Sequence, residues 1–142
     1  MKVTFFVEGT SRPQGSKRAL GNGRMIEASR HLKPWRQTVR FAAQQYRQTD
    51  WPTAGPMSVS VIFTFQRPKS HHTTKGELTR NAPILCTSKS IGDIDKLTRG
   101  ILDALTEVLF DDDSQVIEIN AYKRYCVPNE RPGATITCTS VS

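Results

Sequence analysis

The sequence predicts one α+β domain, with the element order β-α-β-α-β-β, a mixed sheet and helices packed on it. Three observations lead to this class. The 142 residues suit one domain, which we place at 1–142. Short runs rich in β-branched and aromatic residues alternate with two amphipathic helical segments. A long stretch with little periodicity, residues 66–92, separates the second strand from the second helix.

The chain opens with a predicted strand and a basic loop. Residues 3–9 are β-branched and aromatic, and the run is halted by Gly9 and Pro13. Residues 10–28 follow as a loop, and Gly21-Asn22-Gly23 within it predicts a tight turn. We therefore expect a small two-stranded ribbon to project from this loop.

A helix is predicted from about Ser29 to Gln48. Ser29 suits the N-cap, although Pro34 favours a start at Lys33 because proline is tolerated only in the first turn. Apolar residues recur at helical spacing and predict one buried face: Leu32, Trp35, Val39, Ala42, Ala43 and Tyr46. Three arginines fall largely elsewhere on the helix and are expected to stay available for solvent or phosphate: Arg36, Arg40 and Arg47.

The second half predicts a strand, an arm, a helix and two strands. Residues 57–65 alternate between apolar and polar side chains, as expected for a strand. Residues 66–92 carry five basic residues and one acidic residue, so we expect a flexible basic loop that orders on a polyanion. A helix is expected over 94–109 and strands over 115–126 and 134–141.

Charge is distributed unevenly along this basic chain, whose net charge is +7. Residues 1–47 hold ten basic and two acidic side chains, whereas residues 93–118 hold eight acidic and two basic ones. Basic surface neutralises phosphates, and clustered carboxylates next to DNA call for a divalent cation. This pattern is typical of a nuclease, although charge alone is equally compatible with an ordinary basic protein that has one acidic helix.

Composition excludes several other classes. No apolar stretch is long enough to span a membrane, and Glu8 comes too early for a signal peptide, so we expect a cytoplasmic protein. The three cysteines, Cys86, Cys126 and Cys138, form no C-x-x-C pair, which argues against a zinc ribbon and a disulfide framework. No P-loop is present, and we expect no small-molecule cofactor.

Three aspartates are candidates for a metal site. Asp93 and Asp95 lie two positions apart just before a predicted helix, so in an extended segment their side chains point to the same side. Asp113 lies where the next strand begins, and that strand must return against the helix. Hard oxygen ligands without cysteine or histidine favour Mg²⁺ or Mn²⁺ over zinc.

Each of these acids also has a structural interpretation. Asp93 or Asp95 alone is more simply an N-cap, and Asp103 is well spaced to pair with Arg99. The run 111–113 alone is more simply a solvated turn. Their occurrence together within 21 residues of a basic chain favours a functional site.

The motif D-x-D-x-L-x-[KR]-x-x-x-D-A-L, followed by D-D-x-Q-[VI], spans residues 93–116 and resembles the signature of the RusA family of Holliday junction resolvases. Residues 3–48 also resemble the N-terminal half of that family. These are small dimeric endonucleases encoded largely by bacteriophages and prophages. The resemblance implies a Mg²⁺-dependent crossover junction endodeoxyribonuclease that acts in DNA recombination and repair, with Mn²⁺ able to substitute.

The resemblance assigns roles to individual positions. Asp93, Asp95 and Asp113 match the family's metal-binding aspartates, and Arg99 occupies the place of a frequent catalytic lysine. An arginine can still clamp a phosphate, but it does not donate a proton as a lysine can. The expected reaction is hydrolysis of a phosphodiester by water, as two symmetric nicks made by a homodimer on branched DNA.

Junction binding is expected to depend on shape and phosphate contacts, because no motif that reads bases is present. Eight basic residues are the candidates for these contacts: Lys17, Arg18, Arg24, Arg36, Lys69, Lys75, Lys89 and Lys96. Two other functions remain open at this point. One is a related nuclease that cuts flaps or forks, and the other is a basic DNA-binding protein without catalysis.

Overall fold

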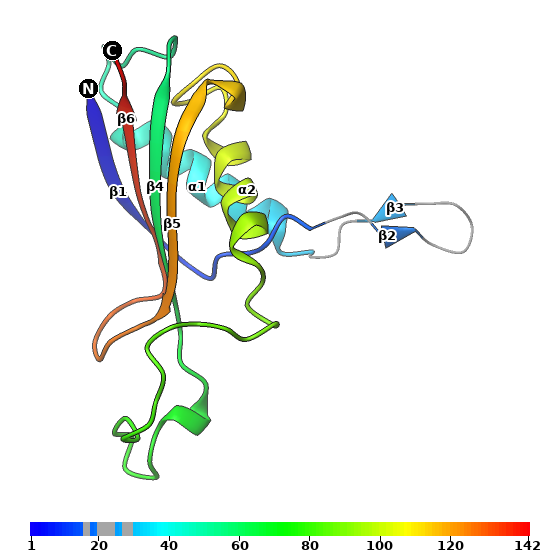
Figure 1. Ribbon diagram of the computed structural model, residues 1–142, viewed down its shortest axis with the longest axis vertical. Coiled ribbons are helices and arrows are strands. Elements are labelled where there is room, and N and C mark those ends of the chain that lie inside the picture. Colours follow the sequence, from blue (N-terminus) through cyan, green and yellow to red (C-terminus); the bar gives the residue numbers. More distant parts are fainter. Residues whose placement is uncertain (16–17, 20–24, 27–29) are drawn as a thin grey trace.

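A four-stranded mixed sheet with both helices on one face forms the body of the molecule (Figure 1). The computed structural model describes residues 1–15, 18–19, 25–26 and 30–142. The sheet order is β1-β6-β4-β5. The predicted α+β class is confirmed. The elements of the body are β1 (Lys2–Glu8), α1 (Leu32–Tyr46), β4 (Met57–Phe65), α2 (Ile94–Leu105), β5 (Val116–Tyr125) and β6 (Gly133–Ser140).

Strand directions explain why the helices lie where they do. β6 pairs antiparallel with both β1 and β4, so it separates two strands that run in the same direction. β4 and β5 are parallel neighbours and need a long crossover, which contains residues 66–92 and α2. This crossover places α2 beside β5, which is one of the two edge strands of the sheet.

The core lies between the sheet and the two helices. Alternate residues of β1, β4 and β6 face the helices and are buried, as the period of two requires, whereas β5 is exposed or half-buried and buries only Tyr125. From the helices, Trp35, Val39, Leu97 and Ile101 pack into the same cluster. The bounds of β4 match the prediction for residues 57–65, because its polar and apolar residues alternate along most of its length.

The N-terminal loop leads into a small ribbon. β2 (Arg18–Ala19) pairs antiparallel with β3 (Met25–Ile26), which confirms the predicted ribbon, and Figure 1 shows it projecting away from the sheet. The turn at 21–23 and the proposed cap Ser29 lie outside the described residues. α1 begins at Leu32, so Pro34 falls in the first turn, where its missing N–H has no partner to lose.

α2 ends four residues earlier than predicted. The helix stops at Leu105, and Glu107 takes a left-handed conformation with φ of 71°. The prediction to residue 109 was wrong because Val108 and Leu109 are buried by a tight turn and not by a further helical turn. Donors from outside α2 stabilise this turn: Arg40, Arg47 and Trp51 donate to the carbonyls of Thr106, Val108 and Leu109.

The segment 66–92 is irregular apart from a short 3-10 helix, η1 (Lys69–His71), and is fastened at several points. Arg67 donates to the Cys126 carbonyl over 2.9 Å and its guanidinium lies 5.4 Å from the Tyr125 ring centroid. Lys123 donates to the Gly92 carbonyl over 2.7 Å. The expectation that this segment orders on a polyanion stays a prediction.

The three cysteines are buried and unpaired. Burial raises the pKa of Cys86 and of Cys138 to about 11, so both remain thiols at neutral pH. In the described part of the chain, no helix is long and apolar enough to cross a membrane.

Candidate active site

A pocket of about 470 Å³ lies between α2 and the edge strand β5. Three of the four predicted catalytic residues line it, namely Asp95, Arg99 and Asp113. The rest of the wall is mainly apolar and comes from both elements: Ile94, Thr98, Leu102, Ile119 and Ala121. The fold thus unites side chains from two segments that the crossover brings together.

The first turns of α2 present Asp95 and Arg99. These residues are four positions apart and therefore lie on one side of the helix, about 6 Å apart along its axis. Both side chains are exposed, and within the described residues neither has a hydrogen-bond or ion-pair partner. Thr98 is buried between them and its hydroxyl donates to the Ile94 carbonyl over 2.7 Å.

A short 3-10 helix, η2 (Asp113–Gln115), presents Asp113 just before β5. Gln115 fixes this turn with four hydrogen bonds. Its amide oxygen accepts from the backbone N–H groups of Asp111 and Asp112, at 2.8 and 2.9 Å. Its amide nitrogen donates to the carbonyls of Thr53 and Gly55, at 2.9 and 2.8 Å. The turn is thereby fastened to the chain that leads into β4.

Asp112 caps η2 and does not line the pocket. Its carboxylate accepts hydrogen bonds from the Ser114 hydroxyl and backbone N–H. These bonds stabilise the charged form and hold the pKa of Asp112 below its ordinary value. The solvated-turn interpretation therefore holds for Asp112, whereas Asp113 is free within the described residues.

Asp93 occupies the N-cap position of α2 but makes no capping hydrogen bond with its side chain. Its carboxylate instead lies 3.7 Å from the ammonium of Lys96, outside the lining of the pocket. The structure therefore brings two of the three predicted aspartates to one pocket. No group of three or more His, Cys, Asp or Glu able to hold a metal is present among the described residues.

The donor chemistry nevertheless suits a hard divalent cation. Asp95 and Asp113 offer carboxylate oxygens that have no partner among the described residues, and no thiol or imidazole of the described residues lines the pocket. Asp93 precedes Asp95 by two residues at the N-terminus of α2, and its ion pair with Lys96 is exposed to solvent. The ligand set of Asp93, Asp95 and Asp113 stays a prediction.

Asp103 has a structural partner, but not the one predicted. It pairs with Arg36 of α1, at 3.8 Å, and accepts a hydrogen bond from Gln14, whose own oxygen accepts from Arg36 over 2.9 Å. Pairing with Arg99 was the wrong expectation, because α1 and the loop at Gln14 pack against this side of α2 and supply closer donors. Arg99 is left to face the pocket.

The same packing engages the arginines of α1. Arg36 binds Gln14 and Asp103, while Arg40 and Arg47 donate to carbonyls after the end of α2. All three are therefore engaged within the protein and are not wholly free as expected, because Asp103 and the carbonyls after a helix end need donors, although each guanidinium keeps N–H groups that these contacts do not use.

The other predicted DNA contacts fall into three groups. Lys96 pairs with Asp93, as described above. Lys69, Lys75 and Lys89 are exposed on the segment 66–92. Lys17 and Arg24 lie outside the described residues, and Arg18 is described only as part of β2. Contact of any of these residues with DNA stays a prediction.

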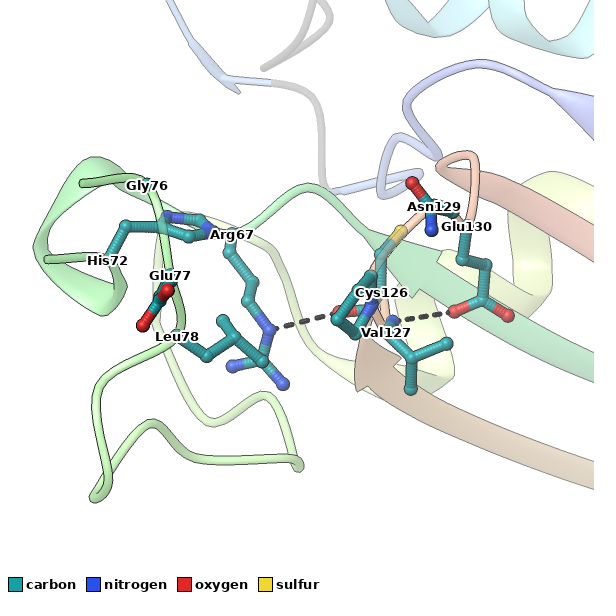
Figure 2. A pocket seen from close by; sticks show the side chains of 10 residues that line it. Arg67, His72, Gly76, Glu77, Leu78, Cys126, Val127, Asn129 and Glu130 are labelled. Carbon is teal, nitrogen blue, oxygen red and sulfur yellow. Dashed lines mark hydrogen bonds between the residues drawn. The ribbon is translucent and has the colours of Figure 1, made fainter.

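A larger cavity of about 580 Å³ lies between the segment 66–92 and the turn after β5, and contains none of the predicted site residues (Figure 2). Two of its three charged side chains, Arg67 and Glu130, are already used within the protein, while Glu77 is exposed. Arg67 donates to the Cys126 carbonyl, and Glu130 binds Arg124 through both oxygens and accepts from the N–H of Val127. The cavity therefore marks where the segment is anchored.

Sequence reasoning missed the roles of Gln115 and Gln14. The signal for Gln115 was present, because Asp112-x-x-Gln115 has the spacing of a capping box, which the structure shows. Gln14 carries no comparable signal. Its backbone N–H donates to the Lys96 carbonyl, and the preceding Pro13 lies against Gly92, whose φ is 108°.

Comparisons with known proteins identify the family of this chain. The family described as Endodeoxyribonuclease RusA matches residues 7–139. An uncharacterised protein of Bacillus subtilis (strain 168), YqaN, is 30% identical over 145 aligned positions, which cover all of this chain and 97% of YqaN. Because the family match spans nearly the whole domain, the chain belongs to the RusA family of endodeoxyribonucleases.

Proposed function

We propose that this protein is a Mg²⁺-dependent endonuclease that resolves four-way DNA junctions by paired, symmetric hydrolysis of phosphodiester bonds. The observation that carries the proposal is the pocket in which Asp95, Arg99 and Asp113 converge in a member of an endodeoxyribonuclease family. The action of such enzymes on a four-way junction requires two sites, so we propose that a homodimer with twofold symmetry is the active form.

Asp93, Asp95 and Asp113 are the proposed ligands for Mg²⁺, with Mn²⁺ as a substitute. When bound, such an ion lowers the pKa of a coordinated water and stabilises the leaving oxygen of a phosphodiester. For Asp93 to join the other two, its carboxylate must leave Lys96. Lys96 is then free to approach a phosphate, which is the DNA contact predicted for it.

Arg99 is the proposed phosphate clamp. Its guanidinium is unpartnered among the described residues and lines the same pocket as both aspartates. A fixed positive charge there stabilises the charge that develops on the phosphoryl oxygens, which is worth several kcal/mol in comparable sites, about 10²–10³-fold in rate. Because arginine stays protonated, it supplies charge and hydrogen bonds but no proton.

Incision of an end-labelled four-way junction, beside a linear duplex of equal length, tests this function. We expect paired nicks on opposing strands in Mg²⁺, no nicks in EDTA, and no nicks with Asp95→Asn. Asp103→Asn, assayed at saturating enzyme so that DNA affinity does not enter, is the matched control, since it removes a carboxylate of the same helix that does not line the pocket. Binding without cleavage in any divalent ion would contradict the enzyme, and cleavage of flaps, forks or duplex equal to that of junctions would contradict the resolvase.

A further inference from the structure

A second hollow on the helical face lies between α1 and α2. It measures about 290 Å³ and is lined by four polar or basic residues of α1 and two residues of α2: Lys33, Arg36, Gln37, Arg40, Asp103 and Ala104. We propose that this α1–α2 groove binds backbone phosphates of the DNA strand that enters the Asp95–Asp113 pocket. The proposal rests on the function proposed above and adds residues to it.

The groove and the pocket are neighbours on α2. Arg99 lines the pocket, and Asp103, which follows it by four residues, lines the groove. Four residues of helix rise about 6 Å, so Arg99 and Asp103 are about one turn apart, with the pocket on the β5 flank of α2 and the groove on its α1 flank. A strand that places its reacting phosphate at Arg99 and crosses the exposed side of α2 can reach the groove within about two nucleotides, because each nucleotide advances about 3.4 Å along the duplex axis.

Basic groups follow one stripe of α1. Lys33, Arg36 and Arg40 are three and four positions apart and thus lie on one side of the helix, about one turn from each other. Gln37, in the same stripe, adds an amide that can donate to a phosphate oxygen. A line of donors at this spacing suits a chain of phosphates better than one small anion.

The two arginines are held in place before any ligand arrives. Arg36 is fixed by Gln14 and Asp103, and Arg40 by the Thr106 carbonyl and, at 3.5 Å, by Glu107. Each guanidinium has five N–H donors and uses only some of them in these contacts. Orientation by neighbouring groups lowers the entropy lost when the remaining donors bind phosphate.

The acidic groups near the groove are matched by these arginines. Asp103 is the acid in the lining, against three basic side chains, and Gln14 donates to it as well. Glu107, which contacts Arg40, is not in the lining. The groove therefore keeps a net positive charge.

Lys33 and Gln37 are the best probes, because both are exposed and neither has a partner among the described residues. Lys33→Gln removes a charge from the groove, and Gln37→Glu adds the opposite one. Lys2→Gln is the matched control, since Lys2 is also exposed but lies on the opposite face of the sheet from the helices.

The measurement is the affinity of the full chain for a four-way junction and for a linear duplex in EDTA, at several salt concentrations. For Lys33→Gln we expect the slope of log K against log salt to fall by about 0.9, the value for one phosphate contact. Gln37→Glu is expected to weaken binding at every salt concentration. Lys2→Gln is expected to match the wild type, and melting temperatures confirm that all variants are folded.

A wild-type slope in Lys33→Gln, or an equal fall in Lys2→Gln, would overturn the groove proposal. These outcomes are independent of catalysis. If Lys33→Gln shifts the slope in a protein that cuts no junction, the groove stands and the endonuclease proposal fails. If the protein cuts junctions and Lys33→Gln binds like the wild type, the endonuclease stands and the groove fails.

Discussion

Two pairs of aspartates within one acidic segment differ in what surrounds them. Asp103 and Asp112 each accept hydrogen bonds, Asp103 from Gln14 and Asp112 from Ser114. Asp95 and Asp113 have no partner within the described residues and line one pocket. The two pairs look alike in the sequence, because each has one member in the helix and one in the acidic run after it.

The hydrogen-bond partners of an aspartate, and not its residue type, therefore distinguish the structural acids from the candidate catalytic ones. A carboxylate that accepts hydrogen bonds from the protein contributes to folding and is poorly placed to take a cation as well; Asp93 makes no capping hydrogen bond and has only an exposed ion pair with Lys96. Two carboxylates without partners among the described residues, in one pocket, keep their oxygens available for a hard cation.

The largest effect is expected from removing the free carboxylates. Asp95→Asn and Asp113→Asn should each lower junction cleavage by at least about 10²-fold, because each loses a charged oxygen at the reacting phosphate. The measurement is single-turnover cleavage at saturating enzyme. Asp103→Asn should stay within a few-fold of the wild type, and equal loss in all three variants would remove the distinction between the pairs.

A smaller effect is expected from the residue that positions Asp113. Gln115→Ala loses four hydrogen bonds and should lower cleavage by about 10- to 100-fold and stability by about 1–2 kcal/mol. Gln115→Glu keeps the accepting oxygen and loses the donor, so its cleavage rate and stability should lie between those of Gln115→Ala and the wild type. The readout that distinguishes positioning from folding is the Mg²⁺ concentration for half-maximal cleavage, which should rise in both variants; an unchanged value would assign Gln115 a purely structural role.

Asp103→Asn should act on DNA binding and not on chemistry. Removing this carboxylate frees the charge of Arg36 beside the α1–α2 groove, so junction affinity in EDTA should increase by up to about five-fold, the equivalent of one surface charge pair. Fluorescence anisotropy with a labelled junction measures this change. Weaker binding by this variant would show that Asp103 serves to hold Arg36 for DNA.

The smallest effect concerns the titration of Asp112. Its pKa lies below the ordinary aspartate value because the Ser114 hydroxyl, first, and the Ser114 backbone N–H stabilise the carboxylate. The stability that it contributes is therefore present above the ordinary value and is lost as pH falls through the lower, folded one. Carbon-detected NMR titration should show this lowered midpoint, and Ser114→Ala should raise it; equal midpoints would contradict the capping role.

The sequence alone predicts correctly those elements that depend on the pattern of neighbouring residues. β4 alternates over most of its length and has the predicted bounds, and β2 and β3 form the ribbon expected on either side of residues 21–23. The joint spacing of the acids also singles out Asp93, Asp95 and Asp113 as candidates for one site, and two of them, Asp95 and Asp113, line one pocket. These features depend on neighbours in the chain, which a sequence displays directly.

The end of α2, and which aspartates lack a hydrogen-bond partner among the described residues, depend on tertiary packing. Leu109 looks helical by spacing, yet its carbonyl accepts from Trp51, far away in the sequence. The spacing of Asp103 and Arg99 suits an ion pair, yet in the structure Asp103 contacts Gln14 and Arg36. The physical reason is that hydrogen-bond donors and charges act through space over a few ångströms, so the partner of a side chain is set by packing between elements and not by its position along one of them.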